Sequence, residues 1–200
     1  MKKLFFLSFL ILSSCSNNSD FKLSASSDIS DGEMVYLVQY KENIPVLKDS
    51  ASVVKGNFTF SDSILVPEMH YIFFKNIKGN IPVILEPGNI NITVYKDSLR
   101  RTKINGTKSN DDFKTYVDES SSLINELNNI QNEINYNIAL NDSLLTDDLE
   151  KQFINMRKKL TDYEFDFMKN KNDSYISALI LQRMVFERSL DYDKADSIMN

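Results

Sequence analysis

The sequence is poor in the residues on which many catalytic and binding sites depend. Its 200 residues include one cysteine, one histidine, five glycines and no tryptophan. The chain has no glycine-rich phosphate loop, no GxSxG nucleophile motif and no EF-hand pattern of alternating Asp and Asn. A lone histidine without a second histidine or a free thiol is a weak metal ligand. We therefore expect no catalytic residue, no metal site and no cofactor.

The chain also lacks a strong positive charge. Its formal net charge is −5, and its basic runs, Arg100-Arg101 and Arg157-Lys158-Lys159, are short. Neutralisation of phosphates by Lys and Arg supplies most of the affinity for nucleic acids, so we predict no nucleic-acid partner. The 13 Phe and 9 Tyr residues, without Trp, favour a packed core over a sugar-stacking surface.

The first residues have the layout of a secretory signal. Lys2 and Lys3 precede an apolar run at positions 4–12 that only Ser8 interrupts. A charged start followed by a short apolar stretch is typical of the signal peptide of an exported protein. A permanent transmembrane helix needs roughly 20 apolar residues, so this run is too short to form one.

The segment Leu12-Ser13-Ser14-Cys15 follows and resembles the bacterial lipobox, at which the cysteine is acylated and the signal is cut. We predict a signal peptide at residues 1–14, and a lipidated Cys15 with a polar tether at residues 15–20. The alternative is that Cys15 is an ordinary small residue in an uncleaved apolar segment.

Acylation of Cys15 would use the only thiol of the chain, which excludes a disulfide, a CxxC redox pair and a thiolate metal site. No Asp follows Cys15, and in some bacteria such an Asp keeps lipoproteins in the inner membrane. We therefore expect a lipid-anchored protein of the bacterial cell envelope, with the outer membrane favoured and the folded part facing the periplasm or the surface.

Residues 21–106 have the period-two pattern of short strands separated by turn residues. The pattern predicts seven or eight strands that form an antiparallel β-sandwich or a partly open barrel. The turns are marked by Asp31-Gly32, Lys55-Gly56-Asn57, Lys78-Gly79-Asn80 and Glu86-Pro87-Gly88-Asn89. The predicted strands cover 21–25, 34–40, 58–60, 71–74, 81–85, 90–94 and 102–104.

Residues 107–200 change to the period of helices, so the fold class is α+β. Ser109 and Asp112 resemble a helix capping pair. Two seams with steps of three and four follow and predict an antiparallel helical hairpin. The predicted third helix covers 175–190, and 191–200 looks like the opening of a fourth. The seams are Phe113, Tyr116, Ser120, Leu123, Leu127, Ile130 and Ile134, then Leu145, Leu149, Phe153, Met156, Leu160, Tyr163 and Phe167.

A few polar residues invite a functional interpretation. His70 stands at the head of a predicted strand, and we interpret it as a strand-edge residue. The carboxylate pairs Asp111-Asp112 and Asp147-Asp148 are expected in first helical turns, where acidic groups meet the helix dipole. Asp-Ser-apolar triplets, which resemble the acceptors of an O-glycosylation system or ordinary turn chemistry, begin at Asp49, Asp62, Asp97, Asp142 and Asp196.

Four short segments accompany the lipobox: KGNFTF at 55–60, LEPGNI at 85–90, INGTKSN at 104–110 and NDSYISA at 172–178. Together they resemble the N-terminal domain-of-unknown-function region of TlpA/AhpC-TSA-type thiol–disulfide interchange lipoproteins. In that family a thioredoxin-like domain with a WCxxC site comes next. This chain has no Trp and no second Cys, so the resemblance implies a location and an architecture but no catalytic residue.

The sequence thus predicts a membrane-anchored, non-catalytic module that binds a protein partner through a sheet edge or the helical hairpin. One alternative is a truncated oxidoreductase without its thioredoxin domain. A second is a periplasmic binder of a small ligand or peptide in the mouth of the β domain. We also expect an incompletely covered third helix, and rapid hydrogen exchange in residues 191–200.

Overall fold

The structure is a computed structural model and describes residues 19–140 and 143–187. The predicted signal peptide, Cys15 and the segment 191–200 lie outside these residues. Eight strands form two sheets of four, ordered β4-β1-β7-β8 and β3-β2-β5-β6. They confirm the predicted α+β class with a sandwich. The strands are β1 (Asp20–Ser27), β2 (Met34–Lys41), β3 (Ile44–Ser52), β4 (Asn57–Ser63), β5 (Glu68–Phe74), β6 (Asn80–Leu85), β7 (Gly88–Val94) and β8 (Lys103–Asn105).

One strand pair departs from the predicted antiparallel order. β1 and β7 run parallel, with Leu23 opposite Ile90 and Ala25 opposite Ile92. Alternation of apolar residues is the same for either direction, so the sequence pattern does not distinguish them. β3 was not predicted because most of its side chains are exposed and its sequence therefore does not alternate.

The main core lies between the two sheets. Alternate residues of the strands point into it, as Phe21, Leu23 and Ala25 do from β1. The tight turn between β3 and β4, which belong to different sheets, requires a glycine, because Gly56 has φ +71° and a Cβ there would lie 2.7 Å from the Ser27 carbonyl oxygen. The predicted turn at 55–57 is therefore confirmed in detail.

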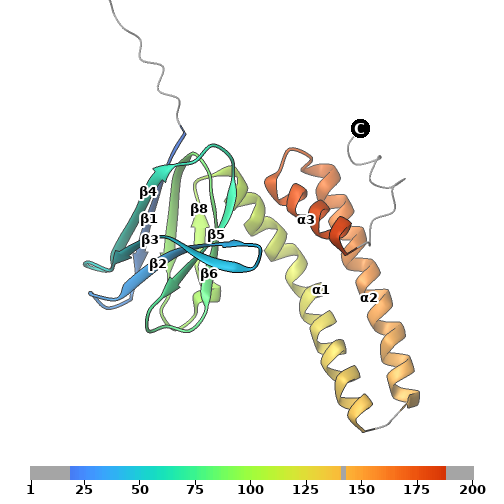
Figure 1. Ribbon diagram of the computed structural model, residues 1–200. Coiled ribbons are helices and arrows are strands. Elements are labelled where there is room, and N and C mark those ends of the chain that lie inside the picture. Colours follow the sequence, from blue (N-terminus) through green and yellow to red (C-terminus); the bar gives the residue numbers. More distant parts are fainter. Residues whose placement is uncertain (1–18, 141–142, 188–200) are drawn as a thin grey trace, which may run out of the picture.

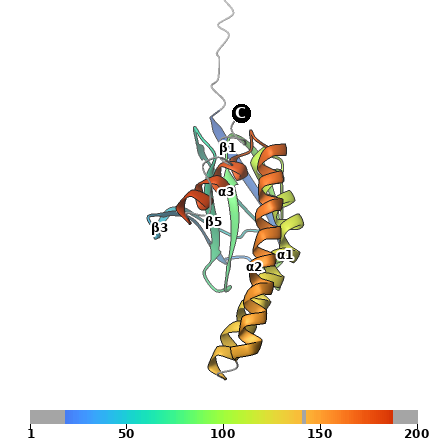
Figure 2. The same ribbon diagram turned by 90° about the vertical axis from the view of Figure 1, so that its right-hand side faces the viewer.

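Three helices follow on one side of the sandwich: α1 (Lys108–Ala139), α2 (Ser143–Asn170) and α3 (Tyr175–Phe186) (Figures 1 and 2). α1 and α2 form the predicted antiparallel hairpin, and the middle parts of the two seams meet in one buried cluster. Phe113, Tyr116 and Phe167 belong instead to a cluster shared with α3. With 32 residues, α1 is about 48 Å long. The far end of the hairpin extends beyond the sandwich (Figure 1).

α3 packs over the outer face of the second sheet. Ile176, Ile180 and Met184 are buried in one cluster with Ile84 of β6. Ile81, Val83 and Leu85 face the sandwich core, so β6 is buried on both faces. This explains why β6 reads as a nearly continuous apolar run rather than an alternating one.

The start of α1 differs from the prediction. The N-cap residue is Thr107, and its side chain makes no capping hydrogen bond. Ser109 instead donates from its backbone N and its Oγ to the Glu86 carboxylate, both at 2.7 Å. Asp112 forms ion pairs with Lys108 and Lys171. The Ser109–Asp112 capping pair is therefore wrong, because a carboxylate from the sheet takes the place of a local cap.

The predicted position of Asp147-Asp148 in a first helical turn is also wrong. α2 begins at Ser143 and has no acidic residue in its first turn, so Asp147-Asp148 lie further along the helix. Asp111 does lie in the first turn of α1. Asp148 accepts a hydrogen bond from Gln152 one turn on, at 2.9 Å, which is an ordinary interaction on a solvated helix face.

Candidate functional site

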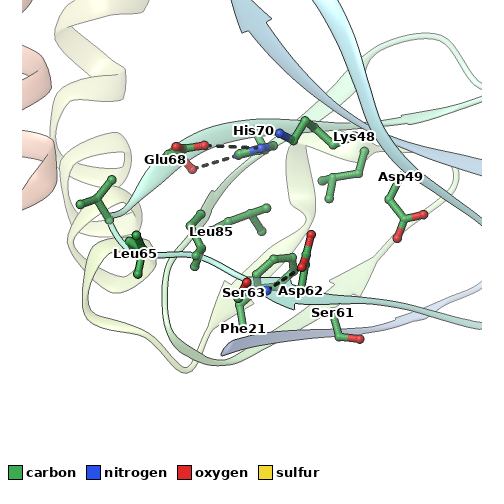
Figure 3. Close-up of a pocket in the computed structure, with 13 residues that line it drawn as sticks. Phe21, Lys48, Asp49, Ser61, Asp62, Ser63, Leu65, Glu68, His70 and Leu85 are labelled. Atoms are coloured by element: carbon green, nitrogen blue, oxygen red, sulfur yellow. Dashed lines mark hydrogen bonds and ion pairs between the residues drawn. The ribbon is translucent and has the colours of Figure 1, made fainter. Parts of the chain in front are cut away.

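A pocket of about 580 Å³ opens at the end of the sandwich where the chain crosses from β4 to β5 (Figure 3). We call it the mouth pocket. Both sheets contribute to its wall, and residues 64–66 link them across its edge. It is lined by Phe21, Leu37, Lys48, Asp49, Ser61, Asp62, Ser63, Ile64, Leu65, Val66, Glu68, His70 and Leu85.

The apolar residues of the mouth pocket divide into a floor and a rim. Phe21, Leu37 and Leu85 belong to the sandwich core and are almost fully buried. Leu65 and Val66 are 88% and 59% exposed. An apolar floor with apolar side chains at the opening is typical of a site that binds a partly apolar ligand.

His70 is a buried polar group on the pocket wall. It is 1% exposed, and its Nδ1 lies 3.2 Å from the Glu68 carbonyl oxygen. A carbonyl only accepts hydrogen bonds, so Nδ1 carries the proton and Nε2 has a free lone pair. Burial lowers the pKa of His70, which favours this neutral form. Nε2 lies 3.9 Å from a Glu68 carboxylate oxygen, beyond hydrogen-bond distance.

The interpretation of His70 as a strand-edge residue is therefore wrong. It is the third residue of β5, a central strand, and faces inward with Ile72 and Phe74. A signal for this existed in the sequence, because the three residues are spaced by two. The local pattern located most of the other strands that form the pocket, but it did not show that they meet around His70.

Three carboxylates share the mouth pocket with His70. Glu68 accepts a hydrogen bond from the Gln39 amide at 2.8 Å. Asp49 and Asp62 each accept one from the backbone N of the serine that follows, at 2.7 and 2.8 Å. These bonds leave one carboxylate oxygen of each acid without a partner among the described residues. Asp49, Asp62 and Glu68 therefore each provide the pocket with one carboxylate oxygen that can still accept a hydrogen bond.

Lys48 is the one cation among the residues that line the mouth pocket. Leu37 pairs with Asp49 and Val38 with Leu47, so the register shifts at this point and Lys48 has no partner residue on β2. Such a β-bulge redirects the extra side chain. No described residue forms an ion pair with Lys48.

Residues 19–140 and 143–187 contain no group of three or more His, Cys, Asp or Glu placed to hold a metal ion. The carboxylates of the mouth pocket are spread over its wall rather than directed at one point. None of the described helices is both long enough and apolar enough to span a bilayer.

A second surface feature lies at the far end of the helical hairpin. We call it the hairpin tip. Its five large apolar side chains have exposed fractions between 46% and 84%. They contrast with the middle of the hairpin, where the seams bury their apolar residues. The hairpin tip consists of Tyr136, Ile138, Leu140, Leu144 and Leu145.

A buried ionic network joins the three helices. Tyr116 donates to Glu164 at 2.7 Å, and Arg183 forms an ion pair with the same carboxylate at 2.6 Å. Glu164 is 2% exposed. Burial, and then the hydrogen bond to Glu164, raises the pKa of Tyr116. Because these groups pair with one another across the three helices, we assign them to helix packing.

The Asp-Ser-apolar triplets at Asp49 and Asp62 place Ser50 and Ser63 on the surface of β3 and β4. In both, the aspartate accepts a hydrogen bond from the backbone of its serine. This is local turn-type chemistry. The triplets at Asp142 and Asp196 include residues outside the described part of the chain.

Residues 21–113 match a family model described as a domain of unknown function (DUF4369). No curated protein and no solved structure gave a match. The matched stretch includes both sheets and the first residues of α1, so the contact between Glu86 and Ser109 lies within it. The relation to thiol–disulfide interchange lipoproteins stays a prediction.

Proposed function

We propose that this chain is a lipid-anchored lipoprotein of the bacterial envelope, and that it binds a protein partner through the hairpin tip. The observation that carries the proposal is the exposed apolar surface of the tip. Contiguous exposed apolar side chains are characteristic of protein–protein interaction sites.

The position of the hairpin tip supports this proposal. The chain enters the sandwich at Asp20, and the tip lies at the opposite end of the molecule (Figures 1 and 2). A lipid on Cys15 would hold the end near Asp20 at the membrane. Because α1 is about 48 Å long, the tip would then stand well away from the lipid surface.

The proposed module is not an enzyme. Cys15 is the only thiol in the chain, so its acylation would leave none for thiol–disulfide exchange. The soluble part from Ser16 onward should therefore not reduce insulin. Measurable turnover by this thiol-free protein would contradict the non-catalytic interpretation.

Site-specific photocrosslinking in cells tests the partner site. A photoreactive amino acid at Tyr136 should give a discrete crosslinked species, while the same group at Glu126, an exposed position nearer the middle of α1, should give none. The species should disappear when Ile138→Ser and Leu144→Ser are added. Both side chains are exposed, so these changes should alter stability by no more than about 0.5 kcal/mol each.

The outcomes distinguish a partner site from incidental contact. Identical species from positions 136 and 126, or a species that survives the double substitution, would overturn the proposal. Circular dichroism of the purified variants provides the control, since an unchanged helical signal shows that the hairpin still forms.

A further inference from the structure

We propose that the mouth pocket binds a free α-amino acid with an apolar side chain. The site lies in the sandwich, away from the hairpin tip, so this proposal does not depend on the proposed partner binding. Residues of the pocket offer a position for the apolar side chain, the ammonium group and the carboxylate of such a ligand.

The apolar side chain of the ligand would occupy the floor. Phe21, Leu37 and Leu85 form a buried apolar surface there, and Leu65 at the rim is exposed and free to cover an occupant. The volume of about 580 Å³ lies within the range of roughly 300–1,000 Å³ that small-molecule sites occupy.

The ammonium group would be held by His70 and Glu68. Nε2 of His70 has a free lone pair on the pocket wall and therefore needs a hydrogen-bond donor. The Glu68 carboxylate lies beside it and supplies the opposite charge. An ammonium carries three donors, enough to bond to both groups.

The carboxylate of the ligand would pair with Lys48. Glu68 and Lys48 lie on either side of His70 in Figure 3, and both charges act on its imidazole. Lys48 has no ion pair with the described residues, although three carboxylates share the pocket. A zwitterion satisfies both ends of this arrangement, since its opposite charges are joined through one carbon.

Other ligand classes fit less well. A simple anion would meet the carboxylates of Asp49, Asp62 and Glu68, and a simple cation bound at Glu68 would leave the charge of Lys48 unpaired. A metal ion needs convergent ligands, which the described residues do not provide.

The full-length protein, purified in detergent with its anchor in place, allows a direct test by calorimetry. L-phenylalanine is compared with 2-phenylethylamine and 3-phenylpropionate, which keep the ring and retain only one of its two charges. L-leucine is compared with isopentylamine and 4-methylpentanoate in the same way. We expect one of the amino acids to bind at least about tenfold more tightly than both of its single-charge analogues, because each lost charge-assisted hydrogen bond weakens binding by about that factor.

His70 provides a second readout, since it is the only histidine in the chain. In protein labelled with ¹⁵N-histidine and prepared without a histidine tag, the Nε2 resonance should shift as the amino acid saturates the site. The Nδ1 resonance should move less, because its bond to the Glu68 carbonyl oxygen is retained.

Two variants separate the charged contacts. Lys48→Met should weaken amino-acid binding about tenfold without weakening amine binding, whereas Glu68→Gln should weaken amino-acid binding without weakening acid binding. Lys22→Met and Glu126→Gln are matched controls at exposed positions outside the pocket and should change nothing.

Three results would overturn the proposal. The first is no saturable binding of either amino acid up to about 10 mM, which is weaker than about 3 kcal/mol of binding free energy. The second is a single-charge analogue that binds as tightly as the amino acid. The third is unchanged amino-acid affinity in both pocket variants, which would place the binding elsewhere.

Discussion

Asn110 joins the start of α1 to β6 through two hydrogen bonds, and Asn110→Ala should show how much stability this contact provides. Asn110 is 1% exposed. Its Oδ1 accepts from the Ile84 backbone N at 3.0 Å, and its Nδ2 donates to the Ile84 carbonyl oxygen at 2.7 Å. The amide thus pairs with β6 much as a neighbouring strand would. Nδ2 also donates to Thr107 Oγ1 at 2.8 Å.

Alanine would remove all three bonds and leave two buried backbone groups of Ile84 without a partner. An unsatisfied buried polar group costs about 1–3 kcal/mol. We therefore expect a loss of about 3–4 kcal/mol in the free energy of unfolding, set against a total of about 5–15 kcal/mol for a typical domain. With a urea m-value of about 2 kcal/mol/M, the urea midpoint should fall by about 1.5–2 M.

Urea unfolding followed by circular dichroism measures this change. Asn128→Ala is the matched control, because Asn128 lies on the exposed face of the same helix. It should shift the free energy of unfolding by no more than about 0.5 kcal/mol. A loss below about 1 kcal/mol for Asn110→Ala would refute the idea that its amide secures the helix to the sheet.

Three further predictions concern single residues. Gly106 has φ +104°, and a Cβ there would lie 2.4 Å from the Asn89 carbonyl oxygen, so Gly106→Ala should lower the free energy of unfolding by more than about 1 kcal/mol in thermal unfolding. The loss should exceed that of Gly32→Ala, because a Cβ at Gly32 meets nothing within 4 Å. Equal losses in the two variants would contradict this prediction. Burial lowers the pKa of folded His70, so its contribution to stability is complete above the unfolded pKa of about 6.5 and declines as the pH falls below it. Between about pH 7 and 5 the urea midpoint should therefore fall more in the wild type than in His70→Gln. Parallel plots of midpoint against pH for the two proteins would contradict the role of His70. Cys15→Ala should abolish labelling by a fatty-acid analogue and release the protein from the membrane fraction, whereas persistent labelling would exclude Cys15 as the anchor.

The sequence determined the class of the fold and the order of its parts. Period-two alternation located most strands, since one face of each is buried in the sandwich. The seams with steps of three and four predicted the hairpin, and the structure buries Leu127, Ile130, Leu149 and Leu160 together. These signals are local, because each residue reports only whether its own side chain is buried.

Contacts between distant segments were decided only by the tertiary structure. β1 lies parallel to β7, Glu86 replaces the expected cap at Ser109, and His70 faces a pocket built from both sheets. In each case the partner comes from another strand or helix. Alternation states which face of a strand is buried but not which segment covers it, so only the folded chain brings these groups together.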